Sequence, residues 1–328
     1  MPKIQENESI KSLRKIAQKL GLGKALLQIH QLRALTLKGA FKLNLAKSRY
    51  LKKILTAKPI PAGEGAIEVH MLLHHKRIYE GLWALYSFAY FCDKPCRIVV
   101  HNDGSLTNID LGLLNQLLPQ CQVIDRETAN SVVLNYFHQA GLIKCAQFRE
   151  KLIFALKLFD PFFFSKNRAF ILLDSDVLFF SRPQELLDGI EANENPADLT
   201  NLYSVDNSYR YSLQSTELAT LLGKDCIERF NPGVLRAYQG TLDFMRIEQY
   251  LQCKDFWNED GTANYYAELT LWAMELTRSN ALPLPNTYAI CPDPKSPNVV
   301  SGHYCGGGYW ASLFYTRGLP CLASSFLD

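Results

Sequence analysis

Two carboxylates directly follow an apolar segment in the middle of the chain. Asp174 and Asp176 come after Phe170–Leu173, a segment that is typical of a buried strand. Unpaired ionised carboxylates are very costly in an apolar core, so the pair needs partners at the strand end. In extended backbone both would point to one side, with Ser175 on the other, and could share one hard divalent cation with phosphate oxygens. The pair therefore predicts a Mn²⁺ or Mg²⁺ site that acts on a diphosphate leaving group.

An Asp-x-Asp triplet carries little weight by itself, because about one is expected by chance in a chain of this composition. The alternative interpretation is an Asx turn or a helix cap at the strand end. The preceding strand favours the metal site, since ligands of open α/β sheets bind at the carboxyl ends of strands. The same rule directs attention to Leu73–Lys76 and His101–Gly104.

The segments around the triplet alternate between strand and helix patterns. Short apolar segments predict strands, and apolar residues recurring at helical spacing predict helices. The expected strands are 66–73, 97–101, 121–124 and 170–173, and the expected helices are 78–89, 111–118 and 148–159, the last closed by Asp160-Pro161. This alternation predicts an α/β fold over residues 63–328, with a mainly parallel sheet between two layers of helices.

Several segments, taken in order, resemble the GT-A-fold glycosyltransferases, enzymes that move a sugar from a nucleotide diphosphate donor. Phe170–Phe180 resembles their DxD strand, and Phe154–Phe159 resembles the helix before it. Phe230-Asn-Pro-Gly-Val-Leu235 is similar to their Phe-Asn-Ser-Gly-Val-Leu signature. The remaining segments are Leu85–Phe88 with Arg97–Gly104, Tyr266–Leu271 and Gly302–Gly306. The resemblance spans about residues 66 to 320 and implies a Rossmann-like GT-A sheet, a UDP- or GDP-sugar donor and transfer of a hexose to an acceptor hydroxyl.

The resemblance also implies a metal shell and a phosphate contact. His303 lies in the segment Ser301–Gly308, expected to be a flexible loop after a strand at 298–300, and would complete the shell with Asp174 and Asp176. The alternative is a loop histidine that only hydrogen-bonds phosphate or backbone. Lys157 would meet a donor phosphate, or would be a solvated helix lysine.

Polar residues after the first two strands are expected to contact the nucleotide. Asp103 could accept a hydrogen bond from the ribose or base, or could only form the turn Asn102-Asp103-Gly104. His74 is placed to contact the nucleotide, and the adjacent His75 should point to the opposite face. The two histidines are therefore not expected to share an ion.

Three later residues are expected to contact the sugar. Asn231 and Gly233 could offer side-chain and backbone hydrogen bonds to it. Glu268, near a helix start, could bind a sugar hydroxyl, act as base for the acceptor, or only stabilise the helix terminus. Glu268 and the metal ligand Asp176 are the expected catalytic residues.

Two residues depart from the family pattern. Pro232 replaces the usual Ser, and Leu269 stands where Gln is common. These departures leave open a relative that binds a sugar nucleotide or glycan without turnover. A nucleotidyltransferase ranks lower, because Leu73–Ile78 contains no glycine for a phosphate-binding loop.

The net charge of +3 hides an uneven distribution. Residues 1–60 carry fourteen Lys/Arg and two Glu, a balance of +12, whereas residues 61–328 carry 21 Lys/Arg and 30 Asp/Glu, a balance of −9. Leu and Ile among the cations predict a basic helical arm over residues 1–62, joined to the body by the linker Pro59–Gly63. The arm could lie on an anionic membrane, near a lipid-linked acceptor, or could pack on the acidic body. Nucleic acid is not expected as a partner, because the arm has almost no aromatic residues and the body is acidic.

The expected cellular location rests on the absence of membrane-spanning and signal-peptide patterns from this sequence. No apolar segment approaches the roughly 20 residues of a spanning helix, and the N-terminus has no signal-peptide pattern. The nine scattered cysteines fit buried thiols in a reducing compartment. We therefore expect a cytoplasmic protein, peripheral at the inner face of the membrane.

Overall fold

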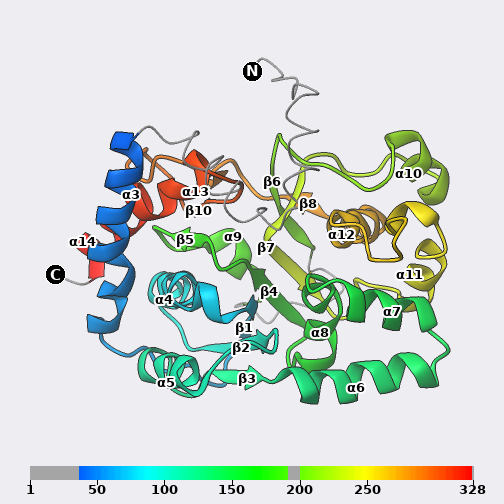
Figure 1. The fold of residues 1–328 in the computed structure, drawn as a ribbon, viewed down its shortest axis with the longest axis horizontal. Helices are drawn as coiled ribbons and strands as arrows, with labels where there is room; N and C mark the ends of the chain where they lie inside the picture. Colours follow the sequence, from blue (N-terminus) through cyan, green and yellow to red (C-terminus); the bar gives the residue numbers. More distant parts are fainter. Residues whose placement is uncertain (1–36, 191–199, 327–328) are drawn as a thin grey trace, which may run out of the picture.

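A seven-stranded sheet lies at the centre of the computed structural model, which describes residues 37–190 and 200–326 (Figure 1). The strand order is β3-β2-β1-β4-β7-β6-β8, and of its six pairings the two that involve β7 are antiparallel and the other four parallel. The strands are β1 Ile67–Leu73, β2 Cys96–Asn102, β3 Gln122–Ile124, β4 Ala169–Leu173, β6 Leu202–Val205, β7 Phe230–Tyr238 and β8 Leu282–Pro283. The predicted α/β class with a mainly parallel sheet is confirmed.

Helices cover both faces of this sheet, and the alternation of side chains along β4 divides the core between them. Ala169, Ile171 and Leu173 pack into one apolar cluster, and Phe170 and Leu172 pack into the other. The first cluster involves α4 Ile78–Cys92, α5 Asn108–Leu117, α9 Gln184–Leu187, α13 Tyr309–Leu313 and α14 Leu319–Phe326. The second involves α6 Arg126–Gln139, α7 Ile143–Lys151, α8 Ala155–Phe164, α10 Ser215–Leu222, α11 Phe244–Tyr250 and α12 Ala267–Arg278. A strand buried on both faces requires a continuous apolar sequence, which is why β4 has no polar residue.

A second, three-stranded sheet carries the C-terminal histidine. Its order is β5-β10-β9, with bounds β5 Val177–Phe179, β10 Ser301–His303 and β9 Tyr288–Ile290. The prediction of a strand at 298–300 and a flexible loop from Ser301 is therefore wrong. Residues 301–303 are buried and pair with strands on both sides, which holds His303 in regular structure.

The predicted helix over 148–159 is also wrong, because it is two helices. Leu152 adopts extended backbone and ends α7, and α8 begins at Ala155. Pro161 does not close α8 but lies within it, where it removes only one hydrogen bond of the helix. The preceding residue, Asp160, makes a buried two-bond ion pair with Arg149 at 2.7 and 2.8 Å, which ties the two helices together.

The described part of the basic arm packs on the body. Helix α3 (Leu37–Tyr50) and the 3-10 helix η1 (Leu51–Thr56) precede the segment predicted as a linker. Ile54 is fully buried, and the Trp83 indole donates to the Leu51 carbonyl at 2.9 Å. Pro59–Gly63 has no regular secondary structure and connects η1 to β1, and the backbone amides of Ile60, Ala62 and Gly63 hydrogen-bond to the body. The rest of the arm, residues 1–36, lies outside the described residues. The predicted boundary between arm and body at residue 62 therefore stays a prediction.

Three further 3-10 or π turns complete the fold: η2 His75–Arg77, η4 Lys254–Phe256 and η5 Phe314–Gly318. The η5 turn leads from α13 into α14 and packs on α3, where the Lys47 ammonium lies 4.4 Å from the centre of the Tyr315 ring. Among the described helices, none is long and apolar enough to cross a bilayer.

A buried polar chain links β1 and β2 beneath the sheet edge. The His70 ring joins the Glu68 carboxylate at 2.9 Å and the His101 ring at 2.8 Å, and Arg97 pairs with Glu68. If His70 donates to Glu68, it accepts from His101, and His101 Nδ1 is left as an acceptor without a partner. Burial lowers the pKa of His70, partly offset by Glu68, and burial lowers the pKa of His101 well below its usual value.

The buried network of Glu68, His70 and His101 predicts that the folded protein loses stability in mild acid. The unfolded chain protonates both histidines below about pH 6.5, whereas the native state keeps them neutral, so the free energy of unfolding falls as pH falls. Each histidine contributes at most about 1.4 kcal/mol per pH unit. Urea unfolding between pH 7.5 and 5.5 measures the slope, which should be shallower in His101→Phe and unchanged in His138→Gln, a substitution on the exposed face of α6. An identical slope in His101→Phe contradicts this account.

Candidate active site

A cleft of about 610 Å³ opens at the carboxyl ends of β1, β2 and β4. It is lined by seven of the residues predicted from the sequence, namely His74, Asp103, Lys157, Asp174, Asp176, Asn231 and His303. Two further predicted residues lie just behind this lining. Glu268 is buried beside Lys157, and Gly233 lies beneath the His303 ring. The tertiary structure thus gathers residues from more than 200 positions of sequence around one cleft.

The two aspartates lie in a turn and not in the extended backbone that the sequence suggested. The Val177 amide donates to the Asp174 carbonyl at 3.2 Å, which closes a turn between β4 and β5. The Asp174 amide donates to the Gly233 carbonyl, and the Asp176 carbonyl accepts from the Tyr304 amide. The turn is therefore bound on both sides, by the strand that carries Asn231 and by the strand that carries His303.

The neighbours of His303 fix the direction of its lone pair. Asn231 Oδ1 accepts from the Gly233 amide at 2.8 Å, so the atom facing this amide must be oxygen. The same oxygen lies 2.8 Å from His303 Nδ1, which must then donate. Nε2 lies 3.0 Å from Asp176 Oδ1 and 3.7 Å from Asp174 Oδ2, so a protonated Nε2 donates to Asp176 here. If a cation replaced this proton, the lone pair of Nε2 would face both aspartates.

These three residues fit a divalent cation. One ligand atom from each of Asp174, Asp176 and His303 can be chosen so that all lie within 4.8 Å of one another. Two carboxylates with one imidazole suit Mn²⁺, which accepts nitrogen more readily than Mg²⁺ does. The hydrogen bond from the imidazole to Asn231 is the kind of outer contact that orients a ligating histidine. Burial lowers the pKa of His303, but the Asp176 carboxylate outweighs burial and raises that pKa well above its usual value.

A lysine and a glutamate stand behind the aspartates. Lys157 Nζ donates to Asp174 Oδ1 at 2.7 Å and lies 4.0 Å from Glu268 Oε1. Lys157 is buried, so the alternative of a solvated helix lysine is wrong. Burial lowers the pKa of this lysine, but Asp174 and Glu268 together raise it above its usual value. Burial raises the pKa of Glu268 to about 7, partly offset by Lys157, and its Oε1 atom has no hydrogen-bond partner.

The nucleotide side of the cleft is formed after β1 and β2. His74 lines the cleft, whereas His75 begins the turn η2 and pairs with Asp110 at 2.8 Å, so the two histidines have different partners. Asp103 lines the cleft and also makes the predicted turn, because its Oδ1 accepts from the amide and hydroxyl of Ser105. Burial lowers the pKa of His74, with a partial offset from Asp103.

Several lining residues were not singled out from the sequence, among them Arg77, Ile153 and Tyr265. Arg77 belongs to a run of polar residues in which nothing distinguishes it. Tyr265 lies two residues before α12, in a segment with no recognisable motif. Only their position relative to other elements brings them to the cleft, and no spacing pattern in the sequence encodes it.

No protein-family model matches the chain, and no curated protein sequence does. Several solved structures are similar to it. The mouse xyloside xylosyltransferase 1 has 14% sequence identity and a TM-score of 0.45, over 79% of this chain and 94% of that one. The galactosyltransferase LgtC in complex with donor and acceptor sugar analogs has 15% identity and a TM-score of 0.48, over 80% of this chain and 96% of that one.

The glycosyltransferase GlyE of Streptococcus pneumoniae TIGR4 has 12% identity and a TM-score of 0.42, over 76% of this chain and 59% of that one. All three matches are glycosyltransferases. That is the class of enzyme that the sequence resembles. At this identity and TM-score the likeness assigns no activity, so the function below is argued from the side chains of the cleft.

Gly233 gives a direct test of the histidine's position. A Cβ at this residue would lie 2.2 Å from the His303 ring, so Gly233→Ala must displace the imidazole. We expect the affinity for Mn²⁺ to fall by about 10- to 100-fold, as when an outer contact of a metal ligand is lost. Electron paramagnetic resonance of free Mn²⁺ measures it.

The matched control is Gly112→Ala in α5, where an added Cβ meets no atom within 4 Å. It should leave the affinity unchanged and stabilise the helix by up to about 1 kcal/mol. Equal Mn²⁺ affinity in Gly233→Ala and the unsubstituted chain would show that the ring position does not matter for the metal.

Proposed function

We propose that this chain is a metal-dependent glycosyltransferase that moves a hexose from a UDP- or GDP-sugar to an acceptor hydroxyl. The observation that carries the proposal is the convergence of Asp174, Asp176 and His303 Nε2 in one cleft at the carboxyl edge of the sheet. A turn between two strands does not by itself require an oriented imidazole beside these carboxylates.

The proposed division of roles follows the layout of the cleft. Asp174, Asp176 and His303 would hold Mn²⁺ or Mg²⁺, which supplies positive charge against a departing diphosphate. Lys157 would share Asp174 with the metal and add a fixed positive charge for the donor phosphates. His74 and Asp103, on the β1 and β2 side, would contact the nucleotide.

The sugar would lie toward Asn231, Gly233 and Glu268. Asn231 Oδ1 and the backbone amide and carbonyl of Gly233 already have hydrogen-bond partners in the protein. The sugar contacts predicted for these two residues therefore stay predictions. Glu268, with its unpartnered Oε1 and a pKa near 7, is suited to exchange a proton with a hydroxyl. We keep Glu268 and Asp176 as the proposed catalytic residues.

One observation favours a second candidate, a relative that binds the sugar nucleotide without turnover. Pro232 lines the cleft and offers neither a hydroxyl nor an amide hydrogen. Leu269 packs on the second apolar cluster and offers the cleft no polar group. A nucleotidyltransferase is less favoured, because the chain after β1 enters the turn His75–Arg77 with no glycine-rich loop.

The decisive experiment pairs Asp176→Asn with a donor panel of UDP-glucose, UDP-galactose and GDP-mannose. In the unsubstituted chain, Mn²⁺ with one of these donors should raise the melting temperature and support slow donor hydrolysis. Asp176→Asn should abolish the Mn²⁺-dependent part and reduce hydrolysis by about 10²- to 10³-fold. The control Asp225→Asn, at an exposed position outside the cleft, should change neither.

The outcomes separate the two candidates. Unchanged hydrolysis in Asp176→Asn would falsify the metal-dependent mechanism. Mn²⁺-dependent stabilisation by a nucleotide, without hydrolysis or transfer to any acceptor, would favour the binding relative.

We also propose that the basic arm rests on an anionic membrane, which would suit a lipid-linked acceptor. The outer face of α3 carries Phe41 at 69% exposure and Leu45 at 55%, beside the exposed cations Lys42, Arg49 and Lys52. Apolar side chains among cations are typical of a helix that lies in the interface. The positive charge of these lysine and arginine side chains complements an anionic surface, whereas such a surface would repel the acidic body.

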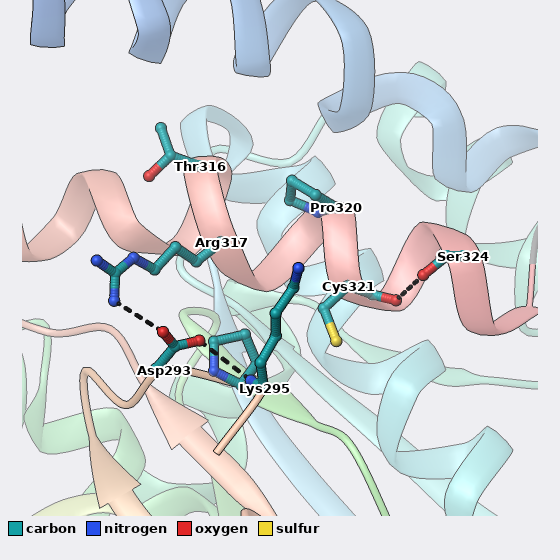
Figure 2. Close-up of a pocket in the computed structure, with 8 residues that line it drawn as sticks. Asp293, Lys295, Thr316, Arg317, Pro320, Cys321 and Ser324 are labelled. Atoms are coloured by element: carbon teal, nitrogen blue, oxygen red, sulfur yellow. Dashed lines mark hydrogen bonds and ion pairs between the residues drawn. The ribbon is translucent and has the colours of Figure 1, made fainter.

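Cations also lie beside α3 and the neighbouring C-terminal helix α14, although α14 itself has no lysine or arginine. A groove between them is lined by Arg49 and Lys53, and an adjoining groove by Lys295 and Arg317. Figure 2 shows the second groove, where Arg317 pairs with Asp293 at 3.4 Å and the Lys295 side chain extends toward the helix. The basic surface therefore includes the folded body and is not restricted to the arm.

Removing the apolar contacts of α3 should release the protein from vesicles. We expect the double variant Phe41→Ser, Leu45→Ser to lower partition onto phosphatidylglycerol-containing vesicles by about tenfold or more. Co-sedimentation measures it, with pure phosphatidylcholine vesicles as the uncharged reference. Ile109→Ser, which removes an equally exposed apolar side chain on α5, is the control and should not change partition.

Truncation should stop before α3, because a deletion through residue 60 would remove the buried Ile54. Partition that is unchanged in the double variant, or equal on charged and uncharged vesicles, would contradict the proposal.

A further inference from the structure

An apolar rim borders the charged part of the cleft. Ile153, Phe154 and Tyr265 all line the cleft and are all exposed, Phe154 by 36% and Tyr265 by 65%. The two aromatic rings meet edge to face, with centroids 5.5 Å apart and planes at 89°. Solvent-exposed apolar side chains that cluster at a cleft with polar groups are typical of a ligand-binding site.

Each aromatic residue lies three positions before a buried charged residue. These are Lys157 in the cleft lining and Glu268 just behind it, which together form the charged floor of the cleft. Phe154 precedes α8, and Lys157 follows three residues later. Tyr265 precedes α12, and Glu268 follows three residues later. Phe154 directly precedes the first residue of α8, Tyr265 lies two residues before α12, and Lys157 Nζ lies 4.0 Å from Glu268 Oε1. The rim and the floor are therefore neighbouring parts of one surface, apolar at the mouth and charged beneath.

Hydrogen bonds hold the rim in place in this structure. Lys151 Nζ donates to the Gly261 carbonyl at 2.7 Å, which ties the segment before Phe154 to the turn before Tyr265. That turn is closed by pairing of Trp257 with Ala263. The Tyr266 amide donates to Asn264 Oδ1 at 3.0 Å and fixes the backbone next to Tyr265. A platform positioned before the ligand arrives loses less entropy on binding.

We infer that Tyr265, supported edge-on by Phe154, is a stacking platform for a pyranose ring of a carbohydrate acceptor. A pyranose has an apolar face of C–H groups and an edge of hydroxyl groups. Its C–H face matches the exposed ring of Tyr265, and its hydroxyl edge matches the charged floor next to it. The inference rests on the proposed glycosyltransferase function and names the acceptor class, a sugar and not a protein side chain or a simple alcohol.

Saturation-transfer-difference NMR with free methyl glycosides tests the platform without donor or metal. The probes are the methyl α- and β-pyranosides of glucose, galactose and mannose. At least one should receive saturation from the unsubstituted chain, strongest at the C–H protons of one ring face. Tyr265→Ala should reduce this signal by roughly fivefold or more. Tyr265→Phe keeps the ring and should retain it.

Two further variants keep the test sharp. Phe154→Leu removes the edge-on support and should weaken the signal even if Tyr265→Ala proves unstable. Tyr90→Ala is the matched control, since Tyr90 is an exposed tyrosine in an edge-on pair with Phe91, on α4 and outside the cleft lining. It should leave the signal unchanged.

No saturation of any glycoside by the unsubstituted chain, or an equal signal in Tyr265→Ala, would overturn the inference. These outcomes are independent of the donor experiment. Asp176→Asn should keep the glycoside signal while losing donor hydrolysis, so a failure of the proposed function and a failure of the platform are read from different samples.

Discussion

The contact between the His303 ring and Gly233 joins the two sheets of this protein, and the candidate site depends on it. The small sheet brings His303 from the C-terminal part of the chain, while β7 of the large sheet provides Gly233 and Asn231. Any side chain at residue 233 would occupy the space of the imidazole. The hydrogen bond to Asn231 then sets the tautomer, so packing and proton position are decided by the same two neighbours.

The charges of the cleft are arranged so that neither aspartate lacks a cation. Lys157 pairs with Asp174, and His303 lies against Asp176. Buried charges are tolerated only with such partners, because desolvation of a lone carboxylate costs several kcal/mol. One ligand atom from each of the two aspartates and His303 lies within 4.8 Å of the others, close enough for one divalent cation to bind all three. Stability of the folded protein and chemistry of the site are therefore served by the same side chains.

The cleft combines this charged floor with an apolar mouth, and both come from the starts of the same two helices. The beginnings of α8 and α12 carry Lys157 and Glu268 inward and Phe154 and Tyr265 outward. Helix α3 presents a different amphipathic surface, in which exposed cations lie beside Phe41 and Leu45. The distribution of charge between a basic arm and an acidic body thus separates a surface suited to anions from a cleft suited to a cation.

Local pattern determined much of this protein. Continuous apolar segments specified the central strands, and helical spacing specified α4 and α5, because burial on both faces or on one face imposes those periods. Asp174 and Asp176 were identifiable since polar residues at the end of a buried strand need partners. Tertiary structure decided the rest. Contacts between residues far apart in the chain produced the break between α7 and α8, the turn that carries the two aspartates and the regular strand at His303. The same kind of contact places Gly233 beneath the His303 ring and Tyr265 at the cleft. Such contacts leave no periodic signal in the sequence, because their energy arises from shape and hydrogen bonding between elements rather than within one.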